Sequence, residues 1–218
     1  MEFEKEEYKN AFFSFLKKGE VMKSQDIFKI NLFLEKAENS FLIAKHHKEI
    51  KLAKDMPRKM FWDYWAIIIF YYSMLYAAKA AILSRGYEVH SHDAASAALG
   101  YLLVPDQIEQ QDLDLLDQSY KIFEDEYVKY FEDAKTESYA ARYSAIKSYT
   151  QRRLDEIFEN ARKFIAKISL ILSDDETIRR YAQGKISKKE LIEALGDKKA
   201  QEVDSVIKTS KKIDSRID

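Results

Sequence analysis

The sequence predicts an all-α protein, and three observations lead to that prediction. Glycine and proline are scarce, with five and two among 218 residues, whereas turn-rich β architectures need more of both. Apolar residues recur at spacings of three and four in several segments, which is the periodicity of an α-helix. One segment, from Trp62 to Leu83, is apolar or aromatic at nearly every position. Such a segment is typical of a helix surrounded by other helices.

The helices of the main body are separated by glycine, proline or polar connections. Gly19 ends the first helix, Pro57 lies in a polar connection, and Pro105 opens the fifth helix. Ser91 or His92 is expected near the N-cap of the fourth, where a short polar side chain accepts a backbone hydrogen bond. We expect helices at residues 3–17, 24–50, 62–83, 91–103, 106–136 and 148–172, with a short, less regular stretch at 137–146.

The end of the chain is predicted to be a separate small helical unit. Ser173 with Glu176 and Ser187 with Glu190 both fit the capping box that begins a helix. Glycine stops divide the tail into three helices, at about residues 175–183, 188–195 and 198–212. We therefore divide the chain into an N-terminal helical extension (1–23), a helical bundle (24–172) and a small helical tail (173–218).

The apolar segment has the length of a membrane span as well as that of a core helix. Asp63 and Lys79 lie inside it, and a polar Tyr71-Tyr72-Ser73 sequence lies near its middle. The other amphipathic helices also need an apolar partner. We therefore interpret the segment as a core helix and expect no membrane association.

Composition and charge narrow the classes of partner. The net charge is −1, so no overall field attracts nucleic acid, and any such contact has to use a local patch. The most basic region runs from Arg142 to Lys167. The N-terminus is acidic and lacks the apolar core of a signal peptide, so we expect a cytoplasmic protein.

No cofactor or metal ion is expected from the sequence. The chain has no cysteine, which excludes disulfides, thiol nucleophiles and zinc sites of the cysteine type. A dinucleotide-binding glycine motif, a P-loop lysine and a zinc-protease helix are all missing from the sequence. Carboxylates are frequent, but no Glu-x-x-His pair has the spacing of a di-iron bundle.

The segment that follows the core helix carries a resemblance to a known family. It reads YYSMLYAAKAAILSRGYEVHSHDAASAAL from Tyr71 onward. A Tyr-Tyr helix, a short loop with Gly86 and a Ser91-His92 pair that opens the next helix resemble one branch of the HEPN family (higher eukaryotes and prokaryotes nucleotide-binding domain). Arg142 and Ala145 keep the spacing of a second, looser family segment. The resemblance covers about residues 28–170.

The resemblance implies an up-and-down bundle of four or five helices that is commonly a homodimer. Many members are RNases that act without metal and carry an Arg-x(4–6)-His pattern. Arg85 satisfies that pattern twice, with His90 and with His92, and His92 is the better match. The resemblance therefore implies Arg85, His92 and His90 as catalytic residues. A departure is that Gly86 stands where active members often have a polar residue.

The chemistry of these residue types suits a phosphate ester. A histidine can take or give a proton near neutral pH, and an arginine offers two charged donors to phosphate oxygens. We add five candidates for binding nucleotide or RNA: Tyr72, Tyr76, Lys79, Arg142 and Tyr143. The alternatives are structural: Arg85 as a helix C-terminal cation, His92 as an N-cap or buried histidine, and the tyrosines as packing residues.

Three functions therefore stay open. The first is a HEPN-like nucleotide- or RNA-binding module, which would belong to a toxin–antitoxin or defence system with a nucleotidyltransferase partner protein. The second is a metal-independent endoribonuclease. The third is a regulatory dimer with a DNA-binding tail, because GKISKKELIEALG within the tail has the rhythm of a small helix-turn-helix.

Overall fold

The computed structural model describes most of the chain as two compact units. The described residues are 4–104, 125–144, 149–172, 177, 180–181, 184–197, 200–201 and 203–205. The first unit holds those up to Ile165, and the second holds those from Ala166 onward. The proposed domain boundaries at residues 23/24 and 172/173 stay predictions.

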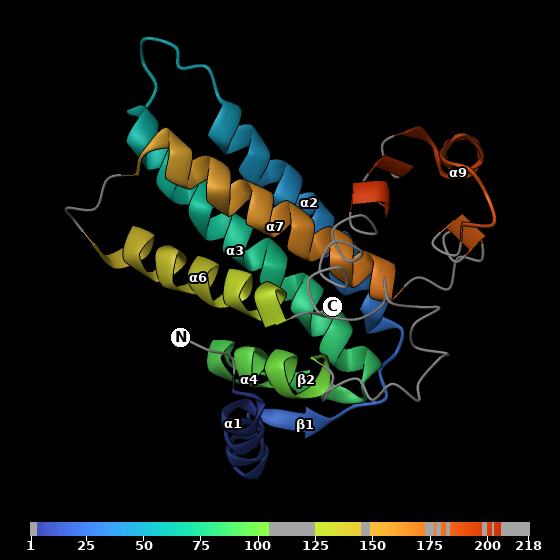
Figure 1. Ribbon diagram of the computed structural model, residues 1–218. Helices are drawn as coiled ribbons and strands as arrows, with labels where there is room; N and C mark the ends of the chain where they lie inside the picture. Colours follow the sequence, from blue (N-terminus) through green and yellow to red (C-terminus); the bar gives the residue numbers. More distant parts are fainter. Residues whose placement is uncertain are drawn as a thin grey trace. The chain divides into compact units, whose positions relative to one another are not determined.

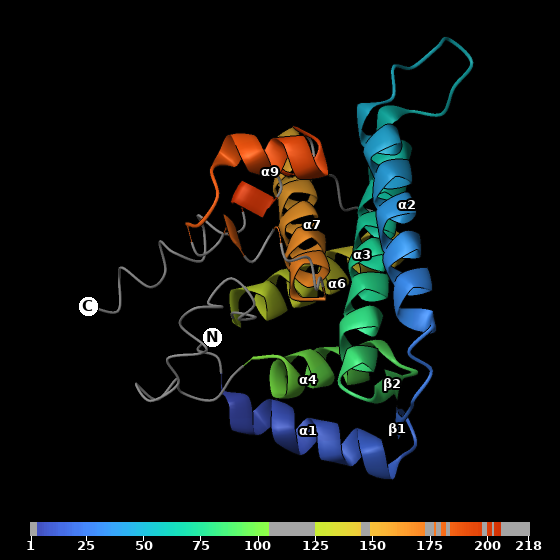
Figure 2. The same cartoon turned by 90° about the vertical axis from the view of Figure 1, so that its right-hand side faces the viewer.

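The first unit is a helical bundle with one short β-ribbon, so the predicted all-α class is confirmed. Helices α2, α3, α6 and α7 run side by side, while α1 and α4 lie together across the far end of α3 (Figures 1 and 2). The elements in chain order are α1 (Lys5–Lys17), β1 (Val21–Lys23), α2 (Lys29–Glu49), α3 (Lys59–Ser84), β2 (Tyr87–Val89), α4 (His92–Leu102), α6 (Asp125–Tyr143) and α7 (Gln151–Ile171).

Helix α3 is the centre of the first unit. It packs against α2, α4 and α6, and Tyr71, Phe70 and Met74 are fully buried. The helix is long and apolar enough to cross a membrane, but 78% of its most apolar window is buried inside the protein, which is the burial of a core helix. One side stays open, since Trp65 is 58% exposed. The expectation that α3 is enclosed on all sides is therefore wrong at this position.

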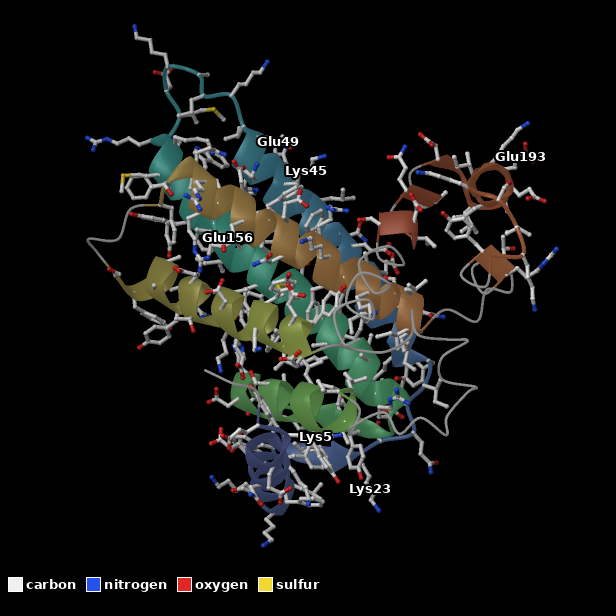
Figure 3. All side chains as sticks on the ribbon, viewed as in Figure 1. Lys5, Lys23, Lys45, Glu49, Glu156 and Glu193 are labelled. Atoms are coloured by element: carbon white, nitrogen blue, oxygen red, sulfur yellow. The ribbon has the colours of Figure 1, made fainter. Side chains whose placement is uncertain are left out.

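Aromatic packing and one charge network join the long helices. Phe158 of α7 lies 5.3 Å from Phe41 of α2 and 5.6 Å from Phe70 of α3, measured between ring centroids. Arg153 of α7 donates to Asp133 at 2.5 Å and to Glu137 at 3.0 Å, both on α6. Lys23, Glu49 and Glu156 are among the charged side chains that lie on the surface (Figure 3).

A two-stranded antiparallel ribbon, which the sequence did not predict, links the N-terminal segment to the loop after α3. Val21 pairs with Val89, and Lys23 pairs with Tyr87. The sequence predicts a helix from residue 24 and a loop after the central helix, whereas the structure has α2 starting at Lys29 and a strand at Tyr87–Val89. Three-residue strands are too short to show the alternation of apolar and polar residues that marks a strand in sequence.

Helix α1 packs on α4 and extends the bundle core. Phe12 is buried with its ring centroid 5.0 Å from that of Tyr101. The Tyr8 hydroxyl donates to Glu132 of α6 at 3.1 Å. Gly100 of α4 lies against the Tyr8 ring, where no larger residue fits. The N-terminal segment is therefore packed into the first unit.

The second unit contains α9 (Lys188–Leu195), which begins with the predicted capping box. The Glu190 carboxylate accepts from the Ser187 backbone at 2.7 Å, and the Ser187 hydroxyl accepts from the Glu190 backbone. Buried Asp204 accepts from Lys188 at 2.7 Å and from Tyr181 at 2.6 Å. A small apolar core is formed by Leu170, Leu191, Ala200 and Val203.

Helix α6 differs most from the prediction. Its described part continues to Tyr143, so the expected end at residue 136 and the less regular stretch from Glu137 are wrong. The small and polar residues of that stretch weaken the apolar pattern, but packing on α3 and the Arg153 contacts support the helix. The start of the predicted acidic helix at residues 106–124, the Ser173 capping box and much of the other two tail helices lie outside the described residues.

Candidate functional site

The structure places His92 at the start of α4 and in contact with α3. Ser91 is the N-cap, and its hydroxyl accepts from the Ala94 backbone at 3.2 Å. This cap fixes the first turn of the helix, so His92 is directed toward the middle of α3. The Nδ1 atom of His92 is 2.8 Å from the hydroxyl of buried Tyr71, a hydrogen-bonding distance.

Arg142 of α6 also contacts α3 next to His92. Its Nη1 donates to the Tyr72 hydroxyl at 3.3 Å, and its Nε donates to the Ser138 carbonyl at 3.3 Å. The His92 ring centroid is 5.8 Å from the Tyr72 ring centroid, with the two rings nearly perpendicular. Tyr72 therefore contacts both an imidazole and a guanidinium that are 50 residues apart in the sequence.

A second cation lies beside these groups. Lys135 of α6 forms an ion pair with Asp93 at 2.8 Å, and Asp93 is the residue directly after His92. Both Lys135 and Arg142 lower the pKa of His92, so both charges are close enough to act on the imidazole. We call Tyr71, Tyr72, His92, Lys135 and Arg142 the His92 cluster.

Electrostatics favour a neutral imidazole in the His92 cluster. Partial burial lowers the pKa of His92 below its usual range, and the charges of Arg142 and Lys135 lower it further, while Asp93 acts in the opposite direction. The positive end of the α4 dipole acts in the same sense as the cations. Burial raises the pKa of the Tyr71 phenol, so the hydroxyl that faces His92 keeps its proton.

The structure does not bring Arg85 to His92 within one chain. Arg85 is the C-cap of α3 and is exposed. It lies 14 residues after Tyr71, which is about 21 Å along the helix axis. In the described part of the chain, no hydrogen bond, ion pair or ring contact joins Arg85 to His92. Arg85 and His92 are close in the sequence but do not form one site within the chain, because β2 separates them and its backbone pairs with β1.

The other sequence candidates lie elsewhere. His90 is exposed, and its backbone donates to the Glu20 carbonyl at 2.9 Å next to the ribbon. Tyr76 and Lys79 face α2, where Lys36 lies 5.7 Å from the Tyr76 ring centroid and Lys79 lies 6.0 Å from that of Phe33. Burial lowers the pKa of Lys79. Neither residue contacts the His92 ring among the described interactions.

Tyr143, the last of the sequence candidates, lies next to the His92 cluster. Tyr139, which was not among the candidates, lies beside it. The Arg142 guanidinium is 5.6 Å from the Tyr143 ring centroid. Tyr139, one turn earlier, has its ring centroid 4.7 Å from that of Tyr143. Lys135, Tyr139 and Arg142 have helical spacing, but the sequence predicts that the helix ends at residue 136, before Tyr139 and Arg142.

The His92 cluster has the chemistry of an anion-binding site. It combines one exposed guanidinium, one ammonium, a neutral imidazole and two phenols, and Arg142 retains N–H donors beyond the two it uses in the described part. Within the described residues there is no group of three His, Asp or Glu side chains that could hold a metal ion. A phosphate group is the anion that such donors suit best.

Comparison with known families identifies the family of the helical bundle. The family model for the HEPN domain matches residues 30–175, which include α2, α3, α4, α6, α7 and the whole His92 cluster. A search against curated proteins gives no significant match. The match supports a nucleotide- or RNA-related module in general terms. Since it covers well over half of the sequence and the helical fold agrees with it, this chain belongs to the HEPN family.

Proposed function

We propose that the protein binds RNA or a nucleotide by its phosphate, and that the His92 cluster is the binding site. One observation carries this proposal: Arg142 and His92, from different helices, both lie next to Tyr72, and the charge of Arg142 acts on the His92 imidazole. The guanidinium is exposed and offers charged, planar donors to phosphate oxygens. Lys135 lies beside it but is paired with Asp93, so the local positive charge that a phosphate would meet in this protein of net charge −1 comes chiefly from Arg142.

The test is a binding titration with a fluorescein-labelled single-stranded oligoribonucleotide and with ATP at fixed, low salt. Arg142→Ala should weaken binding by roughly 10-fold or more, because a charged hydrogen bond to phosphate contributes about 1.5–3 kcal/mol. Arg85→Ala is the matched control, since it removes the same charge from an exposed position outside the cluster. Equal losses in the two variants, or no binding by the wild type, would rule out this site.

A second candidate function is metal-independent cleavage of RNA, and the contact between His92 and Tyr71 favours it. In the neutral tautomer whose Nδ1–H donates to the Tyr71 hydroxyl, Nε2 of His92 carries no hydrogen and can accept the proton of a ribose 2′-hydroxyl. The 2′-oxygen then attacks phosphorus, the bond from phosphorus to the 5′-oxygen breaks, and that oxygen takes a proton from solvent water. Arg142 would stabilise the negative charge that develops on the phosphate. Arg85 would take part only if a second copy of the chain supplied it.

Incubation of the pure protein with RNA in EDTA separates binding from cleavage. If His92 acts as the base, His92→Ala removes cleavage while RNA binding is retained in part, and Arg142→Ala weakens both. Cleavage that is unchanged in His92→Ala comes from a contaminant. Loss of cleavage in Arg85→Ala would assign Arg85 to the site from a partner copy.

The predicted partners belong to the same proposal. A homodimer, or a complex with a nucleotidyltransferase partner protein in a toxin–antitoxin pair, would cover exposed apolar surface on α3. Phe61 and Trp65 are 48% and 58% exposed there, and such side chains are common at contacts between proteins. The molar mass in solution, measured by light scattering for the wild type and for Trp65→Ala, tests the dimer.

A further inference from the structure

Two exposed tyrosines at the end of α6 form a surface next to the His92 cluster. Tyr139 is 63% exposed and Tyr143 is 69% exposed. Their ring centroids are 4.7 Å apart, with an angle of 48° between the ring planes. Neither side chain is needed to fill the core, so their exposure is not explained by packing. We call this pair the tyrosine platform.

Arg142 connects the tyrosine platform to the His92 cluster. Its guanidinium lies 5.6 Å from the Tyr143 ring centroid and 6.0 Å from the Tyr72 ring centroid. A single cation therefore lies close both to an exposed ring of the platform and to a ring of the His92 cluster. This arrangement alternates stacking surfaces with positive charge, as sites for single-stranded nucleic acid do.

Two of the neighbouring acids of α6 form ion pairs with Arg153 of α7. Asp133 and Glu137 accept from Arg153 at 2.5 and 3.0 Å, and Arg153 also pairs with Glu156 at 2.9 Å, so its single charge offsets only part of this negative charge. The cation that contacts the platform is Arg142, which is 5.6 Å from the Tyr143 ring centroid. A phosphate of the ligand would therefore be held at Arg142 itself and not along the whole of this part of α6.

We infer that the tyrosine platform stacks unpaired bases, so that the ligand class of the His92 cluster is single-stranded RNA. This inference rests on the proposed function, because the strand's phosphate is held by Arg142 and His92. Every base has an aromatic face, so stacking on two tyrosines selects for an unpaired strand and tolerates any sequence. A duplex keeps its bases stacked on one another and offers only its phosphates.

The test uses an oligoribonucleotide that carries one 2-aminopurine, whose fluorescence falls when the base stacks on an aromatic ring. The wild type should quench the probe and bind the single strand more tightly than the matched duplex. Tyr139→Ala combined with Tyr143→Ala should weaken single-strand binding about 10-fold or more and remove the quenching, while duplex binding changes little. Replacement of both by phenylalanine should preserve binding, because stacking needs the ring and not the hydroxyl.

The control is Phe28→Ala, which removes a ring that is as exposed as Tyr143 but lies at the start of α2. Single-strand binding that is unchanged in the double alanine variant but reduced in Arg142→Ala would overturn the platform and leave the phosphate site intact. No RNA binding by the wild type would overturn both. A lower molar mass of the double variant, with unchanged RNA affinity, would assign the platform to a protein contact instead.

Discussion

The two ends of the segment between Arg85 and His92 are held by different kinds of interaction. At the Arg85 end the backbone is fixed: the Gly86 carbonyl accepts from Ser24, and β2 pairs with β1. At the His92 end the side chains are fixed, by Tyr71, Tyr72 and the cap at Ser91. At the Arg85 end, backbone pairing fixes the path of the chain. At the His92 end, the packing of α3, α4 and α6 brings an imidazole, two phenols and a guanidinium together.

The largest expected difference between the two ends is in stability. In Gly100→Ala the new Cβ would overlap the Tyr8 ring and lie 2.9 Å from the Tyr8 Cβ. This overpacking should lower the free energy of unfolding by about 2 kcal/mol. In Gly86→Ala the new Cβ meets nothing within 4 Å. The cost is only the strain of placing alanine at a backbone angle φ of +82°, and it should be about 1 kcal/mol. Urea unfolding measures both.

A double-mutant cycle gives this comparison its control. Tyr8→Ala should rescue much of the loss in Gly100→Ala, because it removes the ring atoms that clash and keeps only the Tyr8 Cβ at 2.9 Å, and it should leave the loss in Gly86→Ala unchanged. If Gly86→Ala proved as costly as Gly100→Ala, and Tyr8→Ala rescued neither, the distinction between local strain and packing would be wrong.

The second-largest expected effect is on the pKa of His92, which an NMR titration measures. Its midpoint should lie below the ordinary value of about 6.5, because burial and then Arg142 and Lys135 disfavour the imidazolium. The unfolded chain then binds the proton more readily. The stability that this residue contributes is therefore complete above about pH 6.5 and decreases as the pH falls below it.

Arg142→Ala should raise the His92 midpoint, because it removes a charge that disfavours the imidazolium. Arg85→Ala should leave it where it is, because the structure shows no contact between Arg85 and the imidazole. A shift in the Arg85 variant of the same size as in the Arg142 variant would place both cations at the site.

The smallest effect expected is on the exposed ion pair of the cluster. Asp93 is 72% exposed and pairs with Lys135, so Asp93→Asn should change stability by less than about 1 kcal/mol. It frees Lys135 for phosphate, and RNA affinity at low salt should rise by about two- to five-fold. Asp26→Asn breaks a similar pair with Lys29 near β2 and should not change RNA affinity. Equal increases in the two variants would indicate a general charge effect.

Much of the fold could be predicted because helical periodicity is a local property. The central helix, the Ser91 cap and the capping box at Ser187 all depend on residues within a few positions of one another, and each is found in the structure. The ribbon was missed because three-residue strands carry too little pattern. The end of α6 was missed because its last turns are stabilised by contacts with α3 and α7 that no local pattern shows.

The candidate site was predicted only in part, for the same reason. His92, Tyr72, Arg142 and Tyr143 are brought together as candidates, while Arg85, His90, Tyr76 and Lys79 lie elsewhere. Lys135 and Tyr139 were not singled out, since a lysine and a tyrosine on a solvent-facing helix look ordinary until a histidine from another helix is placed beside them.

By itself the sequence determined the all-α class, the position of the core helix and the HEPN family, because composition, periodicity and a family pattern are written along the chain. The tertiary structure decided which arginine accompanies His92. An arginine seven residues away is separated from it by a paired strand, and one 50 residues away is brought to it by the packing of α6 on α3. Side chains meet across helices according to packing, and packing depends on residues that are distant in the sequence.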